Sequence, residues 1–419
     1  MITVDDALHK VLSATTLQPI EQVASMQAVD RILARDVFST CQLPPFDNSA
    51  MDGFALRCPQ AGLAAGDEFV VTGLQAAGDA AVESAPDGCC EIMTGARVPK
   101  GFNAVVPVEQ VETRFTDADA RPSRIRLSTS VSAGQHIRKA GEDIVVGEKI
   151  IGAGTRLDSR HVMVLAGLGI AEVPVRQRVK VALLCTGREL VDDPAQILLS
   201  GQIRNSNGPY LALRLCQAGA QLVFQATVAD DEAAYTGALQ SALQADAEIL
   251  ISTGAVSMGR YDFVPSALQS LGAEILFHKV AMRPGKPLLF ARLPTGQLVF
   301  GLPGNPVSSA VGLRFFIEPA LRAAYGQPQE RAWRLPLLHS VDNKAGLRHH
   351  QKAVLSVDAR GQLGVSLLAG QESFKTKPLL AANVWAVLPE TASQLPAGSM
   401  IDVLALDHET HPMFESPLP

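Results

Sequence analysis

The spacing of apolar residues predicts different kinds of structure in successive parts of the chain. Apolar positions recur at helical intervals over residues 4–12, and a second amphipathic stretch covers residues 20–37, so residues 1–43 are predicted to be mainly helical. Residues 44–143 instead contain short β-type runs separated by Gly, Pro and Asp, which predicts a mainly β domain. Apolar periodicity returns over residues 144–176. The β domain is therefore predicted to be inserted into a scaffold domain formed by the two flanking segments.

Residues 177–327 alternate apolar strand candidates with longer helical stretches. The strand candidates are VKVALLC, AQLVFQATV, EILIST, EILFHKV, PLLFARL and LVFGL. This alternation is typical of βαβ units and predicts a three-layer α/β domain with a mainly parallel sheet. Residues 328–410 return to short strands, at the spacing of a small β-barrel.

Length and charge narrow the classes of function. At 419 residues the chain exceeds the roughly 250 to 300 residues at which single cores stop growing, so several domains are expected. The net charge of −6 and the lack of a long Lys/Arg block argue against nucleic acid as a partner. An anionic ligand would therefore need cations concentrated locally in the sequence.

Cysteine spacing and the N-terminal sequence bear on the cellular environment. The chain contains Cys41, Cys58, Cys89, Cys90, Cys185 and Cys216. No CxxC pair or close Cys/His set occurs among them, so they are expected to be reduced, buried thiols. The start, MITVDDALHK, lacks the basic and apolar regions of a signal peptide, and no later run reaches membrane-spanning length. These features predict a cytoplasmic protein.

Polar residues and glycines follow the predicted strands of the α/β domain. Ligands of open α/β sheets bind beyond the carboxyl ends of the strands, so five such loops are expected to share one crevice. They are Thr186–Glu189, Asp230–Asp231, residues 253–262, residues 279–286 and Pro303–Pro306.

The 279–286 segment carries three cations, Lys279, Arg283 and Lys286, in an acidic chain. The prolines of its PGKP sequence prevent a continuous helix, and the glycine lets the backbone approach a ligand. We predict an anion loop for phosphate or molybdate oxygens, each charge-assisted bond contributing roughly 1.5 to 3 kcal/mol. The alternative is a solvated basic turn.

The Pro303–Pro306 turn is predicted to open a helix, with Asn305 at the N-cap and Pro306 at the first helical position. Free N–H groups and the positive end of the helix dipole would then face an anion. The alternative is an ordinary capped helix that binds nothing.

Three acids, Glu189, Asp230 and Asp262, follow strands and are candidates for binding Mg²⁺ together with phosphate oxygens. Each acid can also be a helix cap, and Asp262 precedes a predicted helix that has Pro265 in its first turn. In the β region, Asp47 and Asp52 of PPFDNSAMDGFA are either ligand contacts or turn residues, and the sequence leaves both interpretations open.

Seven motifs together indicate a family. PPFDNSAMDG, IMTGARVP, RKAGEDI, TGREL, VSMGRYD, MRPGKP and LPGNPVS resemble, in order and spacing, the molybdopterin molybdenumtransferases, the family of MoeA and the E domain of gephyrin. The resemblance spans nearly the whole chain. It implies a four-domain, L-shaped subunit that dimerises, with an active cleft shared between subunits and an α/β domain similar to the molybdopterin adenylyltransferases.

The resemblance also implies a reaction. Molybdate would be inserted into adenylylated molybdopterin with release of AMP, assisted by Mg²⁺, to form molybdenum cofactor. The expected partners are these small molecules, a second copy of the chain and the molybdopterin adenylyltransferase; no membrane partner is expected.

Site residues follow from the resemblance motif by motif. Asp52, Thr94 and Asp143 would approach the cleft from the β domain. Glu189, Asp230 and Asp262 would serve Mg²⁺, the adenylyl phosphate or the attacking water. Lys279, Arg283 and Lys286 would bind molybdate and phosphate, near Lys352 and Ser373. The other expected ligand contacts are Thr186, Gly187, Ser257, Gly304 and Asn305.

The chain departs from the family pattern at several positions. Lys352 replaces an Arg and loses its bidentate geometry. Thr253-Gly254-Ala255 stands where Gly-Gly is usual, and the added Cβ atoms either block close nucleotide approach or are accommodated if φ there is negative. Arg188 replaces an acid, and Glu372 replaces a glycine. A divergent member with altered metal preference or reduced activity is therefore one interpretation.

Two other functions remain as alternatives. Molybdopterin adenylyltransfer resembles the implied reaction in fold and strand-end loops, but it requires only one domain of ordinary size. A non-catalytic molybdopterin carrier or scaffold is the alternative from a different class.

Overall fold

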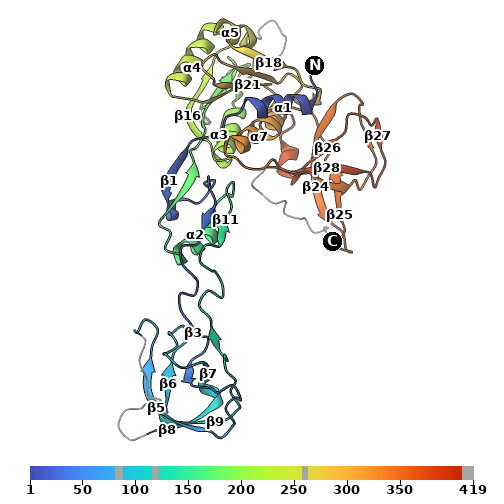
Figure 1. The fold of residues 1–419 in the computed structure, drawn as a ribbon. Helices are drawn as coiled ribbons and strands as arrows, with labels where there is room; N and C mark the ends of the chain where they lie inside the picture. The colour runs from blue at the N-terminus through green and yellow to red at the C-terminus, as the bar shows by residue number, and fades with distance from the viewer. Residues whose placement is uncertain (81–87, 116–121, 257–262, 408–419) are drawn as a thin grey trace.

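The computed structural model describes residues 1–80, 88–115, 122–256 and 263–407. Figure 1 shows an elongated chain with an α/β domain at one end and a C-terminal β domain beside it. A narrow scaffold region leads away from the α/β domain, and two extended connections join it to a β domain at the far end.

The helix α1, Val4–Ala14, begins at Thr3, whose side chain accepts a hydrogen bond from the Asp6 amide. Its buried residues belong to the core of the α/β domain, so α1 is part of that domain and not of the predicted scaffold. This is a correction of the domain boundary. The reason is that the apolar face of α1 packs against the helix α7, Glu318–Ala324.

The predicted second helix at residues 20–37 is wrong. Ile20–Ala24 forms the strand β1, which pairs antiparallel with β12, Glu172–Arg176. A short 3-10 turn, Ser25–Gln27, and the strand β2, Val37–Phe38, follow. Strand pairing supplied by a distant segment overrides the local helical spacing.

The scaffold is built from segments on both sides of the β domain. Besides β1 with β12, β2 pairs with β11, Lys149–Ile151. Helix α2, Ser159–Gly167, covers them and starts at a capping box formed by Asp158 and His161. Residues 20–38 and 149–176 thus share one small core.

The far β domain contains a six-stranded sheet in the order β7-β4-β6-β5-β9-β8. A Cβ on Gly53 would lie 1.9 Å from the Val106 oxygen, so only glycine allows this strand approach. The strands are β4 (Gly53–Leu56), β5 (Glu68–Gln75), β6 (Gly88–Ile92), β7 (Ala104–Pro107), β8 (Val111–Phe115) and β9 (Pro122–Leu127). Outside it, β3 (Asn48–Ser49) pairs with β10 (Ile137–Arg138).

The α/β domain has a central sheet in the order β16-β13-β17-β21-β20-β18, and all six strand candidates from the sequence are confirmed. β16, β13, β17 and β21 are mutually parallel, while β20 runs antiparallel to both of its neighbours. The strands are β13 (Lys180–Thr186), β16 (Gln221–Val228), β17 (Ile249–Thr253), β18 (Glu274–His278), β20 (Leu289–Arg292) and β21 (Leu298–Leu302).

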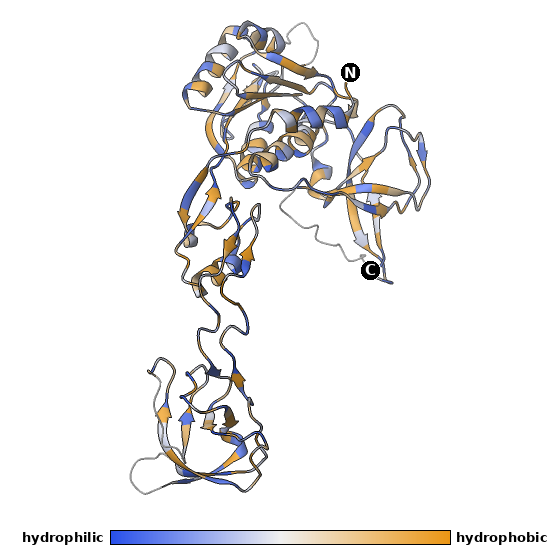
Figure 2. Cartoon of the chain, viewed as in Figure 1, coloured by the Kyte–Doolittle hydropathy of each residue, from blue (hydrophilic) through white to orange (hydrophobic). Residues whose placement is uncertain are grey.

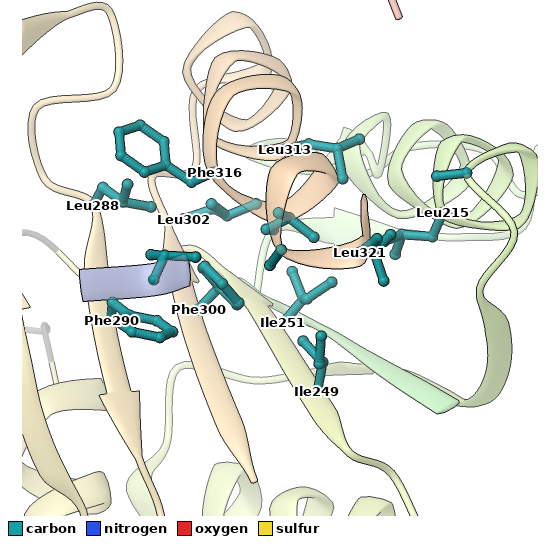
Figure 3. Close-up of a cluster of buried hydrophobic side chains, with 14 of the residues drawn as sticks. Leu215, Ile249, Ile251, Leu288, Phe290, Phe300, Leu302, Leu313, Phe316 and Leu321 are labelled. Carbon is teal, nitrogen blue, oxygen red and sulfur yellow. The ribbon is translucent and has the colours of Figure 1, made fainter. Parts of the chain in front are cut away.

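Both faces of this sheet are covered by helices. α1, α3 (Asn207–Gln217), α6 (Pro306–Gly312) and α7 pack on one face, and α4 (Glu232–Gln244) and α5 (Val264–Ser270) pack on the other. Figure 3 shows the first of these interfaces, with Phe290, Phe300 and Ile251 of the sheet under Leu313 and Phe316. The strands are largely apolar along their length, as a sheet buried on both faces requires (Figure 2).

The C-terminal domain is a sheet in the order β19-β24-β26-β28-β22, with β25 paired to β24. A bridge between Leu337 and Val365 joins the end of β22 to β25 and brings the edges of the sheet together. The strands are β19 (Met282–Arg283), β22 (Trp333–Pro336), β24 (Arg348–Val357), β25 (Leu363–Leu367), β26 (Val384–Leu388) and β28 (Met400–Ala405). β19 comes from the 279–286 segment, so this segment physically links the two domains.

The six cysteines are free thiols, but two are not buried as predicted: Cys216 is exposed and Cys41 is partly exposed. Within the described ranges, none of the helices has both the length and the apolar character needed to cross a bilayer.

Candidate functional site

The strand register brings the predicted loops to one edge of the central sheet. Thr186 lies opposite Val228, Cys185 opposite Thr253, and Thr253 opposite Leu302, so the chain leaves β13, β16, β17 and β21 at the same level. His278 of β18 pairs with Leu289, which in turn pairs with Gly301 near the end of β21. All five loops therefore start at this edge.

The loops do not share one crevice, however. β13 and β18 are four strand positions apart, which at about 4.8 Å per position is roughly 19 Å. Two separate hollows result. We call them the sheet-edge pocket and the interdomain pocket.

The sheet-edge pocket has a volume of about 540 Å³ and lies over β13, β17 and β21. Four residues predicted as ligand contacts line it: Thr186, Glu189, Gly304 and Asn305. The 203–207 segment and Phe374 of the C-terminal domain complete it. This pocket is open enough and polar enough to receive a nucleotide-sized anion.

The Thr253 side chain makes the hydrogen bonds that connect the segments at the base of this pocket. Its buried hydroxyl lies 3.2 Å from the Pro303 oxygen and 3.2 Å from Ser309 Oγ, and it accepts from Asn207 Nδ2 at 3.1 Å. Asn207 also donates to the Gly304 oxygen at 2.7 Å. The Thr253 side chain thus joins the 303–305 turn to β17 and α3.

Ala255 adopts φ of +51°. Its Cβ would be easily accommodated only at a negative φ, and this condition is not met. Gly254 before it has φ of +97°, and a Cβ there would lie 2.4 Å from Thr186 Oγ1. The close approach of this turn to Thr186 is therefore specific to glycine at 254, while Ala255 carries backbone strain.

The carboxylates of Glu189 and Asp230 both contact the turn at residues 187–189, although Asp230 follows a different strand, β16. The Glu189 carboxylate folds back over Gly187, and Asp230 accepts from the Arg188 amide at 3.3 Å. Asp231, not Asp230, caps α4 by accepting from the Ala234 amide. Of the residues described, no three His, Cys, Asp or Glu side chains form a group that could hold a metal. Two carboxylates with phosphate oxygens supplied by a substrate still suit Mg²⁺, which commonly binds in this way.

The 279–286 segment lies on the far side of the sheet edge from Glu189. Lys279 has φ of +77°, and its backbone oxygen accepts from the Ile2 amide at 3.2 Å, while the Ala281 amide donates to the Ile2 oxygen at 2.8 Å. Gly285 approaches α6 closely, because a Cβ there would lie 3.5 Å from the Ser308 oxygen. Lys286 and Arg283 are exposed. The segment thus touches α6 at Gly285, and anion binding by its three cations stays a prediction.

Arg283 lines the interdomain pocket, which has a volume of about 620 Å³. Its other lining residues come from the C-terminal domain: Asp342, Asn343, Lys344, His349, His350, Gln351, Gly370, Gln371 and Glu372.

The start of α6 differs from the prediction. Asn305 occupies the N-cap and Pro306 the first helical position, but the Asn305 side chain makes no capping bond. The Val307 amide donates to the Ser373 backbone oxygen at 3.0 Å, so it is not free to bind an anion. Ser373 therefore contributes a carbonyl to the helix start.

Lys352 is fully buried, and its ammonium donates to the oxygens of Gly370 at 2.7 Å and Lys375 at 3.1 Å. Burial lowers the pKa of this lysine. The side chain points into the 370–375 loop, so in this structure it supports the loop instead of facing either pocket. Its role as an anion contact is corrected to that of a residue that positions Ser373 and Phe374.

Asp52 directly precedes β4 and Thr94 follows β6 of the far β domain, and Asp143 lies in the connection between β10 and β11. The Asp52 carboxylate accepts from the Thr94 amide at 2.6 Å and hydroxyl at 2.8 Å, which lowers the pKa of Asp52. Asp143 is exposed where the connection leaves for the scaffold. Within one chain these residues do not meet the sheet edge. Asp47, the undecided acid, pairs with Lys139 at 2.8 Å.

Ser257 and Asp262 lie outside the described residues. The helix that Asp262 was predicted to cap, α5, has Phe263 at its N-cap position and no side-chain capping bond.

Sequence reasoning missed Asn205, Asn207 and Phe374. Asn205 donates to Asp192 and Thr227 and accepts from the Gly208 amide, which fixes the start of α3. The RNSNG sequence before α3 contained a turn signal that could have drawn attention to this segment. Phe374 lies in a different domain, and nothing in its local sequence placed it at the sheet edge.

Comparison with known proteins gives the family. Residues 2–169 match the model of the MoeA N-terminal region (domain I and II), and residues 182–323 match a probable molybdopterin binding domain. The chain is 40% identical to a molybdopterin molybdenumtransferase of Synechococcus elongatus, over 92% of this chain and 94% of that protein. It is 32% identical to one of Haemophilus influenzae, over 97% and 99%.

A crystal structure of a molybdopterin biosynthesis MoeA protein from Pyrococcus horikoshii has the same arrangement, with a TM-score of 0.79 at 26% identity. The match covers 97% of this chain and 99% of that one. The two family models, the relatives and the solved structure agree, and the chain belongs to the molybdopterin molybdenumtransferase (MoeA) family.

Proposed function

We propose that the chain transfers molybdate into adenylylated molybdopterin and releases AMP, a step of molybdenum cofactor biosynthesis. The observation that carries the proposal is the arrangement of the sheet edge. A polar pocket lies beyond the parallel strands, and a segment with three cations follows β18 at the same edge of the sheet. Relatives that match more than nine tenths of the chain carry the name of this activity.

In this proposal the adenylylated pterin occupies the sheet-edge pocket, with the polar groups at Thr186, Gly304 and Asn305 facing it. The cations Lys279, Arg283 and Lys286 attract molybdate and the phosphate charge, since Arg and Lys donors bind oxyanions through charge-assisted bonds. Mg²⁺ would be held by Glu189 and Asp230, with Asp262 as a further candidate. When bound, the ion would neutralise charge on the phosphate oxygens.

The proposal includes a homodimer. Asp52 and Thr94 belong to the far β domain and Asp143 to the connection that leads from it, and none of them lines the sheet-edge pocket. They would take part only if the β domain of a second copy reached over the pocket, as the family resemblance implies. A cytoplasmic location belongs to the same proposal.

Reconstitution tests the function. The purified protein is incubated with adenylylated molybdopterin, MgCl₂ and molybdate, and the product is used to activate a cofactor-free molybdenum enzyme. We expect activation that depends on both the protein and molybdate. Binding of the pterin without any activation would support the carrier function instead.

The adenylyltransferase alternative needs a separate reaction. Molybdopterin and Mg-ATP are supplied without molybdate, and formation of the adenylylated pterin is followed. We expect none, because the proposed reaction consumes the adenylylated pterin, and adenylyl transfer requires only one domain of ordinary size. Rapid adenylylation would contradict the proposed function.

A further inference from the structure

Phe374 is an exposed aromatic side chain at the sheet-edge pocket. It lines this pocket from the C-terminal domain, and it is 64% exposed. Most of the other lining residues are polar, and the exposed Ile203 adds a second apolar surface. Single exposed apolar side chains are common on protein surfaces, so exposure alone does not indicate a role for this ring.

The backbone on both sides of Phe374 is fixed by hydrogen bonds. The residue before it, Ser373, accepts through its backbone oxygen from the Val307 amide of α6 at 3.0 Å. The backbone oxygen of the residue after it, Lys375, accepts from the buried ammonium of Lys352 at 3.1 Å. The ring is thus held at the pocket although little of it is buried. A group that is already fixed in place loses little conformational freedom when a ligand binds to it.

The neighbouring charged groups leave most of the ring accessible. Lys375 Nζ lies over the ring at 6.0 Å from its centroid, which is the outer limit of a cation–π contact, and it pairs with Glu372 at 2.8 Å. A flat, accessible ring beside a pocket of nucleotide size suits stacking on a planar heterocycle, because aromatic side chains bind nucleobases in this way.

We propose that Phe374 binds the substrate by stacking on one of its planar heterocycles, the adenine or the pterin. The inference rests on the proposed function, which assigns the adenylylated pterin to the sheet-edge pocket. The polar groups at Thr186 and Asn305 can bond to phosphate and hydroxyl oxygens, but they offer no apolar face to a flat ring. Phe374 supplies that face from the C-terminal domain, so both domains hold the substrate.

Isothermal titration of the full chain with AMP and with ribose 5-phosphate, each in the presence of MgCl₂, tests the stack. We expect Phe374→Ala to weaken AMP binding about tenfold, the effect of losing one base–aromatic stack. Binding of ribose 5-phosphate, which has no base, should not change. Phe374→Trp keeps a flat ring and should keep the affinity for AMP, whereas Phe374→Leu keeps apolar volume without a ring and should not.

Leu380→Ala is the matched control, because Leu380 is an exposed apolar side chain of the same domain that does not line the pocket. It should bind AMP as the unchanged protein does, and melting curves show whether each variant is folded.

The same titrations with molybdopterin identify the heterocycle. Weaker binding of AMP by Phe374→Ala assigns the stack to the adenine, and weaker binding of molybdopterin alone assigns it to the pterin. The inference is overturned if folded Phe374→Ala binds both ligands as the unchanged protein does, if ribose 5-phosphate is weakened equally, or if the unchanged protein binds neither ligand. Binding is measured without turnover, so these outcomes are distinct from a failure of the reconstitution assay, which would refute the proposed function and leave the stack intact.

Discussion

Thr253 illustrates how a single side chain can hold a binding site together. Its hydroxyl joins β17 to the 303–305 turn and to the start of α3. The turn is one wall of the sheet-edge pocket, so its position depends on this hydroxyl.

Replacing Thr253 by Val preserves the shape of the side chain but removes the hydroxyl. We expect a loss of roughly 1 to 3 kcal/mol of stability, because buried partners on both sides are left unsatisfied. Thr253→Ser retains the hydroxyl and serves as the control. The measurement is the melting temperature by circular dichroism, and equal values for the Val variant and the unchanged protein would show that the hydroxyl has no structural role.

His350 gives a prediction on pH. It is 2% exposed and lies 4.1 Å from the Phe315 ring, and burial lowers its pKa to about 3, with Arg348, His349 and Arg314 acting in the same direction and Glu390 opposing them. The unfolded chain binds a proton near pH 6.5, while the folded chain does not bind it until about pH 3. The contribution of the neutral His350 imidazole to the free energy of unfolding is therefore fully present above about pH 6.5, and it is lost as the pH falls toward 3.

We accordingly expect the melting temperature of His350→Gln to fall less than that of the unchanged protein as the pH is lowered from about 6.5 to about 3. His339→Gln, which replaces an exposed histidine, should follow the unchanged protein. Thermal melting at several pH values provides the comparison. If the melting temperatures of His350→Gln and His339→Gln fell equally with pH, the assignment of a neutral buried imidazole at His350 would be contradicted.

At the scale of elements, buried ions fasten the C-terminal domain to the α/β domain. Glu318 at the start of α7 is fully buried and pairs with Arg214 of α3, and Arg214 also contacts Asp407 beyond β28 at 2.6 Å. Arg314 donates to the Ala405 oxygen at 3.1 Å and pairs with Glu330 at 2.6 Å. These contacts hold the end of β28 against the helices of the α/β domain.

Glu318→Gln should lower stability by roughly 1 to 3 kcal/mol, because the buried Arg214 and Arg314 each lose one of two carboxylate partners and keep the other. Asp402→Asn breaks only the exposed pair with Arg334 and should change stability by less than about 1 kcal/mol. Unfolding monitored by tryptophan fluorescence reports on Trp385, which is buried between the domains. If the Glu318→Gln protein were as stable as the Asp402→Asn protein, the buried ion pairs of Glu318 would not stabilise the contact between the two domains.

The elements also show what the sequence could predict. Strands such as Ile249–Thr253 are buried on both sides, and their continuous apolar runs were sufficient to identify them. Ile20–Ala24 was taken for helix, because its partner, Glu172–Arg176, lies far away in the sequence. Likewise, the ends of the parallel strands indicated where the site would lie, whereas the division into two pockets depends on the antiparallel β20 and on β19 joining the other domain.

At the scale of the whole molecule, the distance between the β domain and the α/β domain leads to a prediction about assembly (Figure 1). If the cleft is shared, a protein with Asp52→Asn and a protein with Lys286→Ala are both weakly active alone. Mixed and allowed to exchange subunits, they should recover up to about a quarter of full activity, since a heterodimer contains one intact cleft. No recovery in a sample shown to contain heterodimers would place both residues in the same chain's site.

The most direct test of the account is AMP release from adenylylated molybdopterin, measured by chromatography with and without molybdate. We predict that AMP appears in proportion to the pterin consumed, and that its rate of release rises with molybdate concentration until the site is saturated. The absence of AMP, or release at a rate indifferent to molybdate, would contradict the account.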